Sequence, residues 1–341
     1  MLARWPASTG KADPKAVDRT KKGGARQEPS ARRRLNFRPP FAARFLTPMS
    51  TPPTRKPDWL KVRIPGGPNY ARIDRYHREG GLNTVCRGAA CPNQGECWSQ
   101  GTASFMILGN RCTRGCAFCN VGRGEPFPPD PKEAAKVAAA IAELGLKHAV
   151  VTSVTRDDLA DGGAEQFAVL VNEVRRQAPG CRIELLIPDF AGDSDALARV
   201  VDAAPDLLGH NLETVPRLYA DVRRGADYHR SLQLLAEARR LAPGLPLKSG
   251  LMAGLGETVE ELTAVMADLR AAGCSLLTLG QYLAPSRRHH PVQRYLPPEE
   301  FAALREKALS LGFIEVAAGP LVRSSYHAEH QFDAAFPTAT T

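Results

Sequence analysis

Six of the eight cysteines in this 341-residue chain lie within 34 residues, in two groups of three. The first group is Cys86, Cys91 and Cys97, at C-x4-C-x5-C spacing, and the second is Cys112, Cys116 and Cys119, at C-x3-C-x2-C spacing. Four thiolates would complete a zinc site or saturate an iron–sulfur cluster. Three leave one iron of a four-iron cluster open to another ligand. Each group therefore predicts such a cluster, and a zinc site with a distant fourth ligand is the alternative.

An even number of cysteines can also indicate disulfides in a secreted protein. The chain shows no secretory signal and no run of about 18 apolar residues, so neither export nor a membrane span is predicted. A chain of this length also buries a large core without covalent staples. We therefore expect reduced thiols and a cytoplasmic location, with the isolated Cys181 and Cys274 as small buried side chains.

The net charge of +9 lies within residues 1–50, which hold twelve Arg or Lys and three Asp or Glu. The rest of the chain is neutral, so no basic surface for nucleic acid is predicted. Residues 1–50 show no apolar periodicity and are predicted to form a disordered tail. An organelle transit peptide and an over-long start are the alternatives.

Apolar segments of strand length alternate with helical patterns over most of the chain. Strands are predicted at 105–109, 148–154, 182–188, 207–213, 247–253, 275–283 and 313–318, and helices at 132–144, 164–177, 194–203, 229–241, 259–272 and 298–311. Such alternation predicts an α/β fold with a parallel sheet covered by helices. About seven βα units indicate an incomplete TIM-like barrel, and a doubly wound sheet is the alternative.

Polar residues follow five of the predicted strands, where chemistry gathers in such folds. They are Ser153 with Arg156-Asp157-Asp158, Asp189, Asn211 with Glu213, Ser249 with the Gly254-Leu-Gly-Glu257 turn, and Gln281 with Tyr282. Each could instead be a helix cap or a buried polar pair. Together they predict a binding site at one end of the sheet. The Gly254 turn lacks the Lys-Ser/Thr of a P-loop, so it does not predict a nucleotide triphosphate site.

The C-x3-C-x2-C motif resembles the signature of the radical S-adenosylmethionine (SAM) superfamily. With C-x4-C-x5-C before it, the chain is similar to the lipoyl synthase family from about Arg55 to Tyr326. The shared motifs include Arg156-Asp-Asp-Leu, His210-Asn-Leu-Glu-Thr-Val-Pro-Arg217, Lys248-Ser-Gly, Gly254-Leu-Gly-Glu257 and Arg323-Ser-Ser-Tyr326. One departure is Arg87-Gly88, where the family often has acidic residues. The resemblance implies a partial TIM-like (β/α)6 barrel at 105–322, an N-terminal extension with an auxiliary-cluster motif at 51–104, and a C-terminal segment at 323–341 that closes over it.

The resemblance also implies two [4Fe-4S] clusters and SAM as cosubstrate. Cys112, Cys116 and Cys119 would hold the cluster whose open iron binds SAM. Cys86, Cys91 and Cys97 would hold an auxiliary cluster, with Ser325, favoured over Ser324, as its fourth ligand and Arg323 beside it to keep the hydroxyl ionised. The implied SAM-binding residues are Ser153, Asn211, Glu213, Gly254, Gly256 and Gln281. In this assignment the glycines let the backbone approach the adenine, and Glu213 with Asn211 or Ser153 binds the polar end.

The implied reaction is insertion of two sulfur atoms at C6 and C8 of a protein-bound octanoyl-lysine. Cleavage of SAM would give a 5′-deoxyadenosyl radical that takes hydrogen from the octanoyl chain, and the auxiliary cluster would supply the sulfur. The implied partners are octanoylated lipoyl carrier domains (2-oxoacid dehydrogenase E2 or glycine cleavage H protein), an electron donor such as ferredoxin or flavodoxin, and a cluster-repair protein, with neither nucleic acid nor membrane. Arg287-Arg288 and His289-His290 are candidates to meet the carrier. The alternatives are a biotin-synthase-like enzyme, a methylthiotransferase and a zinc-binding scaffold.

Overall fold

The computed structural model of the chain describes residues 55–62, 66–100 and 102–337. The described residues belong to one compact unit. The predicted disordered tail lies outside the described residues. No helix in the described ranges has the length and apolar character needed to cross a membrane.

Seven parallel strands form the main sheet. In spatial order they are β1 (Ser104–Ile107), β4 (His148–Ser153), β5 (Arg182–Leu186), β6 (Leu207–Gly209), β7 (Leu247–Ala253), β8 (Leu276–Gln281) and β9 (Glu315–Gly319). Spatial order follows chain order throughout. A doubly wound sheet would reverse its strand order at one point, so that alternative is wrong.

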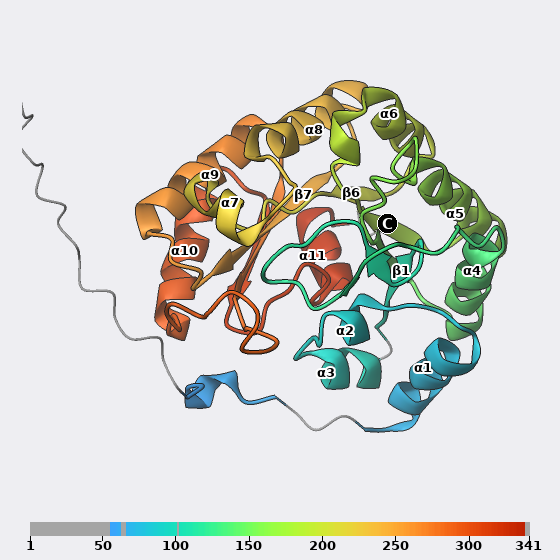
Figure 1. The fold of residues 1–341 in the computed structure, drawn as a ribbon, viewed down its shortest axis with the longest axis horizontal. Helices are drawn as coiled ribbons and strands as arrows, with labels where there is room; N and C mark the ends of the chain where they lie inside the picture. The colour runs from blue at the N-terminus through green and yellow to red at the C-terminus, as the bar shows by residue number, and fades with distance from the viewer. Residues whose placement is uncertain (1–54, 63–65, 101, 338–341) are drawn as a thin grey trace, which may run out of the picture. The chain divides into compact units, whose positions relative to one another are not determined.

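Six long helices follow the first six strands of the sheet and lie on its outside (Figure 1). They are α4 (Glu133–Leu144), α5 (Ala164–Gln177), α6 (Ser194–Asp202), α8 (Tyr228–Leu241), α9 (Val259–Ala271) and α10 (Pro298–Ser310). Each agrees with its predicted range to within one residue at either end, because the chain marks the ends. Thr258 and Glu261 form a capping box on α9, and Asp193 caps α6 through the amides of Asp195 and Ala196.

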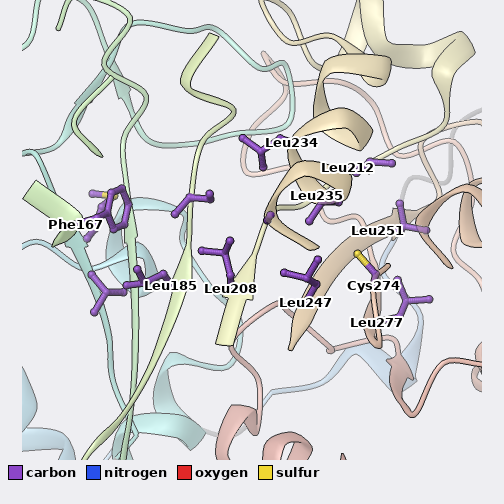
Figure 2. Packing of buried hydrophobic residues seen from close by; sticks show 14 of the residues in the cluster. Phe167, Leu185, Leu208, Leu212, Leu234, Leu235, Leu247, Leu251, Cys274 and Leu277 are labelled. Atoms are coloured by element: carbon purple, nitrogen blue, oxygen red, sulfur yellow. The ribbon is translucent and has the colours of Figure 1, made fainter. Parts of the chain in front are cut away.

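The core lies between the sheet and these helices, and most strand residues are buried, as predicted for a parallel sheet. Figure 2 shows part of this cluster, in which Leu185, Leu208, Leu247 and Leu277 come from four consecutive strands. Cys181 and Cys274 are 2% and 0% exposed, which confirms their prediction as buried side chains.

The N-terminal extension contains three helices, α1 (Pro68–Glu79), α2 (Val85–Gly88) and α3 (Gln94–Ser99). Two members of the first cysteine group lie in these helices, Cys86 in α2 and Cys97 in α3. The Thr84 hydroxyl caps α2 by accepting from the Cys86 amide at 3.2 Å. Trp98 of α3 is fully buried and stacks on His77 with ring centroids 5.2 Å apart.

The segment after β9 ends in α11 (Ala328–Ala335), which contacts both β9 and β4. Arg182 joins it to the sheet through an ion pair with Asp333 at 2.8 Å and a cation–π contact with Phe332. The short elements are β2 (Arg111–Cys112), which pairs with β3 (Gly122–Arg123), α7 (Tyr219–Val222), and the 3-10 turns η1 (Asp58–Leu60), η2 (Phe190–Gly192) and η3 (Pro216–Leu218). None of these, nor α11, was predicted.

Candidate functional site

The first cysteine group shares one pocket with the C-terminal segment. Cys86, Cys91 and Cys97 line it together with Arg323 and Ser325. The remaining lining residues are Asn93, Thr102, Ser104 and Tyr326. Ser324 is not among them, and its hydroxyl accepts instead from Asn211 Nδ2 at 2.6 Å. The structure thus brings Ser325, rather than its neighbour, to the three thiols.

Two hydrogen bonds join these distant parts of the chain. Asn93 Nδ2 donates to the Leu321 carbonyl at 2.6 Å, and the Tyr326 hydroxyl donates to Glu96 Oε1 at 3.2 Å. Asn93 Oδ1 is buried and has no partner among the described residues, although Asn93 lines the pocket. A buried unpartnered oxygen is costly, and here it borders a site that could take a ligand.

Burial governs the chemistry of these thiols. Burial is the largest cause that raises the pKa of Cys97 to about 12, and the neighbouring Cys86 and Cys91 contribute because thiolates repel each other. Burial also raises the pKa of Cys91, although the Asn93 and Gln94 amides and the Arg323 guanidinium lower it. Metal binding requires deprotonated thiols, and a cation among them offsets their repulsion. The pocket therefore favours thiolates once a positively charged iron centre is bound.

The second cysteine group begins with Cys112 at the end of β2 and continues into a loop that contacts other parts of the chain. Ala117 N donates to the Val222 carbonyl at 2.7 Å, and Arg123 Nη2 donates to the Cys116 carbonyl at 2.7 Å. His289 Nε2 lies 3.2 Å from the Cys119 carbonyl, and His290 N donates to the Ala117 carbonyl at 2.9 Å. The two histidines, predicted as candidates to meet a carrier protein, are half-buried against this loop. The neighbouring Arg287 and Arg288 are exposed.

Glu213 interacts electrostatically with the second cysteine group and with Arg323 of the first pocket. Burial raises the pKa of its carboxyl group, while Arg223, the Asn211 amide and Arg323 lower it. Glu213 in turn raises the pKa values of Cys116 and Cys119, and Arg323 interacts with both Cys91 and Glu213. These shared interactions connect both cysteine groups to one region. Glu213 also has a φ of 67°, a strained conformation that persists in proteins mainly at functional sites.

Asn211 contacts Glu213, and Ser153 is a further predicted site residue with a buried side-chain oxygen. Asn211 Nδ2 donates to Glu213 Oε1 at 3.1 Å, as well as to Ser324. Ser153, at the end of β4, has a buried hydroxyl oxygen with no partner among the described residues. A hydroxyl both buried and unpaired is expected where a bound molecule completes its hydrogen bonds.

Gly254, Gly256 and Gln281 build the turn after β7. The φ values of the glycines are 98° and 114°, a conformation that favours glycine. A Cβ atom on Gly254 would lie 2.2 Å from Gln281 Nε2 and 2.3 Å from the Arg294 carbonyl oxygen. Gln281 Nε2 donates to the Arg294 carbonyl at 2.9 Å, and its Oε1 accepts from Leu296 N at 2.9 Å. In this arrangement Gln281 bonds to protein backbone.

The Glu257 carboxylate accepts hydrogen bonds from two amides of this turn, Gly254 N at 2.6 Å and Leu255 N at 2.9 Å. These two amides are therefore already paired. Gly256 is less crowded, since a Cβ atom there would meet only Gln293 Cγ at 3.4 Å. Of the predicted adenine contacts, Gly256 therefore has the more accessible backbone.

Arg223 was missed from the sequence. Its guanidinium is buried and donates to the Tyr219 hydroxyl at 2.9 Å and the Ser231 hydroxyl at 3.1 Å. Its positive charge lowers the pKa values of both Cys116 and Glu213. No signal separates it from the neighbouring Arg224 in the sequence, because burial depends on how α7 packs.

Comparisons with known proteins relate this chain to the radical SAM enzymes. The model of the Radical SAM superfamily matches residues 106–269. The lipoyl synthase of Citrifermentans bemidjiense is 58% identical over 286 residues, which cover 84% of this chain and 97% of that protein. The lipoyl synthase of Acidithiobacillus ferrooxidans is 53% identical over 288 residues, covering 84% and 91%. Among solved structures, methylornithine synthase matches with 15% identity and a TM-score of 0.47 over 63% of this chain and 70% of that one.

Proposed function

This chain belongs to the lipoyl synthase family of the radical SAM superfamily, and we propose that it inserts sulfur at C6 and C8 of an octanoyl-lysine on a carrier domain. As a radical SAM sulfur-inserting enzyme it uses a [4Fe-4S] cluster and SAM. Its protein substrate is a lipoyl carrier. The consecutive strand order, with β1 and β9 at the two edges of the sheet, supports a partial (β/α)6 barrel.

The pocket shared by Cys86, Cys91, Cys97 and Ser325 carries the proposal of a second, auxiliary cluster. Each thiolate of a four-iron cluster binds a different iron, so the sulfurs need not converge on one point. In the described ranges no three His, Cys, Asp or Glu side chains are close enough to share a single metal ion. This arrangement favours two multinuclear clusters over a zinc site.

When bound, the cluster at Cys112, Cys116 and Cys119 supplies the electron that cleaves SAM, and the auxiliary cluster supplies sulfur. The protein's part is to hold these groups. Ser325 offers an alkoxide, a harder ligand than thiolate, which suits a cluster that must release sulfur. The Arg323 charge beside it favours the ionised hydroxyl.

We place SAM against the region around Glu213. The Glu213 carboxylate, half-buried and oriented by Asn211, suits an ammonium group, and the Ser153 hydroxyl has capacity for one more hydrogen bond. We propose that the backbone of Gly254 and Gly256 faces the adenine. Gln281 stabilises this turn through its hydrogen bond to the Arg294 carbonyl.

The proposal of specific protein partners rests on membership of the lipoyl synthase family. We propose E2 domains or H protein as carriers, ferredoxin or flavodoxin as electron donor, and a repair protein that restores the auxiliary cluster. Arg287 and Arg288 are exposed next to the histidines that hold the cluster loop, so they remain the candidates to meet an acidic carrier.

Anaerobic turnover tests the proposed function. The reconstituted protein, given SAM, a reductant and an octanoyl-lysine peptide, is expected to add two sulfur atoms to the peptide, detected by mass spectrometry. A methylthio group on the peptide would instead indicate a methylthiotransferase. An unchanged peptide despite SAM cleavage would exclude this substrate.

Replacing Ser325 by alanine is expected to weaken the auxiliary cluster. Iron should fall from about eight toward about four per chain, because the pocket loses its oxygen ligand. Ser324→Ala is the matched control, since Ser324 bonds to Asn211 and does not line the pocket. Iron and sulfide assays compare the two variants. Equal losses of iron in both would contradict Ser325 as the ligand of the auxiliary cluster.

Replacing Ser153 by alanine should lower SAM affinity by about 2- to 10-fold, the value of one neutral hydrogen bond. Stability without SAM should not fall, because the hydroxyl has no partner to lose. Ser249→Ala provides the contrast, since Ser249 Oγ accepts from Leu212 N at 3.3 Å and its loss should destabilise the fold. Calorimetric titration with SAM and thermal unfolding measure the two effects.

A further inference from the structure

The side chain between the first two cysteines of the second group makes an extensive ion-pair contact. Arg114 donates from Nε to Asp157 Oδ2 at 2.8 Å and from Nη2 to Asp157 Oδ1 at 2.8 Å. The same Nη2 donates to Asp189 Oδ1 at 2.6 Å. The Arg114 side chain is 8% exposed and that of Asp189 is 0% exposed, so these charges are little screened by salt.

These contacts tie the cysteine loop to three elements of the barrel. Asp157 follows β4 and Asp189 follows β5. Asp189 Oδ2 also accepts from Arg230 Nε, in α8, at 2.9 Å. The set of Arg114, Asp157, Asp189 and Arg230, here called the loop clamp, contains two positive and two negative charges and is therefore neutral.

We propose that the loop clamp positions the Cys112–Cys119 loop and that its charge balance sets the reduction potential of the cluster held there. This inference rests on the proposed function, since it requires a cluster at these cysteines. Arg114 lies two residues from both Cys112 and Cys116, and its backbone amide donates to Cys112 Sγ at 3.4 Å. Arg114 is thus a positioning residue.

Because the loop clamp is neutral, the direction in which each substitution shifts the reduction potential can be predicted. Cluster reduction adds one negative charge, so nearby positive charge favours it and negative charge opposes it. Removing Asp157 leaves the clamp with a net positive charge, whereas removing Arg114 leaves it net negative. The two changes should therefore shift the potential in opposite directions, although both break the same ion pair.

The experiment is an EPR-monitored redox titration of the reconstituted full-length protein, following the signal that changes when SAM is added. Asp157→Asn should make the potential less negative, and Arg114→Gln should make it more negative. Arg114→Lys keeps the charge and loses the two-pronged geometry, so its potential should stay near that of the unmodified protein. Its rate of 5′-deoxyadenosine formation should nevertheless fall by about 10- to 100-fold.

Asp158→Asn is the matched control. The Asp158 and Asp157 side chains are 36% and 37% exposed, but Asp158 pairs with Arg156 and makes no contact with Arg114 in the described residues. Its potential should remain unchanged. The proposal is overturned if Arg114→Gln and Asp157→Asn shift the potential in the same direction or not at all, or if Asp158→Asn shifts it as far as Asp157→Asn. If the unmodified protein itself shows no SAM-responsive signal, the proposed function fails as well.

Discussion

Replacement of Cys86, Cys91 and Cys97 together by alanine is expected to abolish the sulfur-containing product while SAM cleavage continues. The reason is that the proposed sulfur donor is lost, whereas the loop of Cys112, Cys116 and Cys119 is untouched. Iron should fall from about eight to about four per chain. Mass spectrometry of the octanoyl peptide and chromatography of 5′-deoxyadenosine measure the two activities in one anaerobic reaction.

The control for the triple variant should remove buried cysteines that are not proposed as cluster ligands. Cys181→Ala with Cys274→Ala fits this purpose, because both cysteines are buried outside the two groups. This double variant should keep about eight iron per chain, even if its stability falls through the cavities it creates. Continued product formation by the triple variant would refute the auxiliary cluster as sulfur source.

Gly280→Ala is expected to reduce product formation by about 100-fold, the typical cost of displacing a catalytic group by about 1 Å. A Cβ atom on Gly280 would lie 2.0 Å from the Val322 carbonyl oxygen and 3.1 Å from Arg323 Nη1. The backbone at Val322 must therefore move, and it carries Arg323 and Ser325 with it. SAM cleavage should be affected far less, so the ratio of 5′-deoxyadenosine to lipoyl product should rise.

Gly244→Ala is the matched control for that experiment. Nothing lies within 4 Å of a Cβ atom built on Gly244, and its φ is not in the positive range. This variant should keep both activities. If Gly280→Ala kept the product ratio of the unmodified protein, the tight packing of β8 against the Val322 segment would have no bearing on sulfur insertion.

Apolar periodicity was sufficient to predict the parallel sheet and the six long helices. The helices begin and end at local signals such as the Thr258 capping box, which depend on residues three or four apart. The short α2 and α3 were missed for the opposite reason. The Gly, Pro and Asn residues in and between them indicate a loop, whereas the Thr84 cap stabilises α2 and the burial of Trp98 stabilises α3.

The cysteine spacing and the Arg323-Ser-Ser-Tyr326 motif identified the residues of the first pocket, because both are local patterns. Ion pairs between residues far apart in the chain produce no recognisable pattern in the sequence, so they could not be predicted. Arg114 is 75 residues from Asp189, and Arg230 is 41 residues from it, so the loop clamp depends on the assembled barrel. His289 and His290 were predicted as candidates to meet the carrier, but in the structure both contact the second cysteine loop, which the sequence does not indicate.

The hydrogen bond from Asn93 to Leu321 joins residues 228 positions apart. At a synthesis rate of about 5–20 residues per second, the ribosome needs roughly 10–45 s to proceed from one to the other. During most of that interval Cys86, Cys91 and Cys97 have been synthesised, but Ser325 has not. The complete set of residues proposed to hold the auxiliary cluster therefore forms only after the C-terminal segment has been translated.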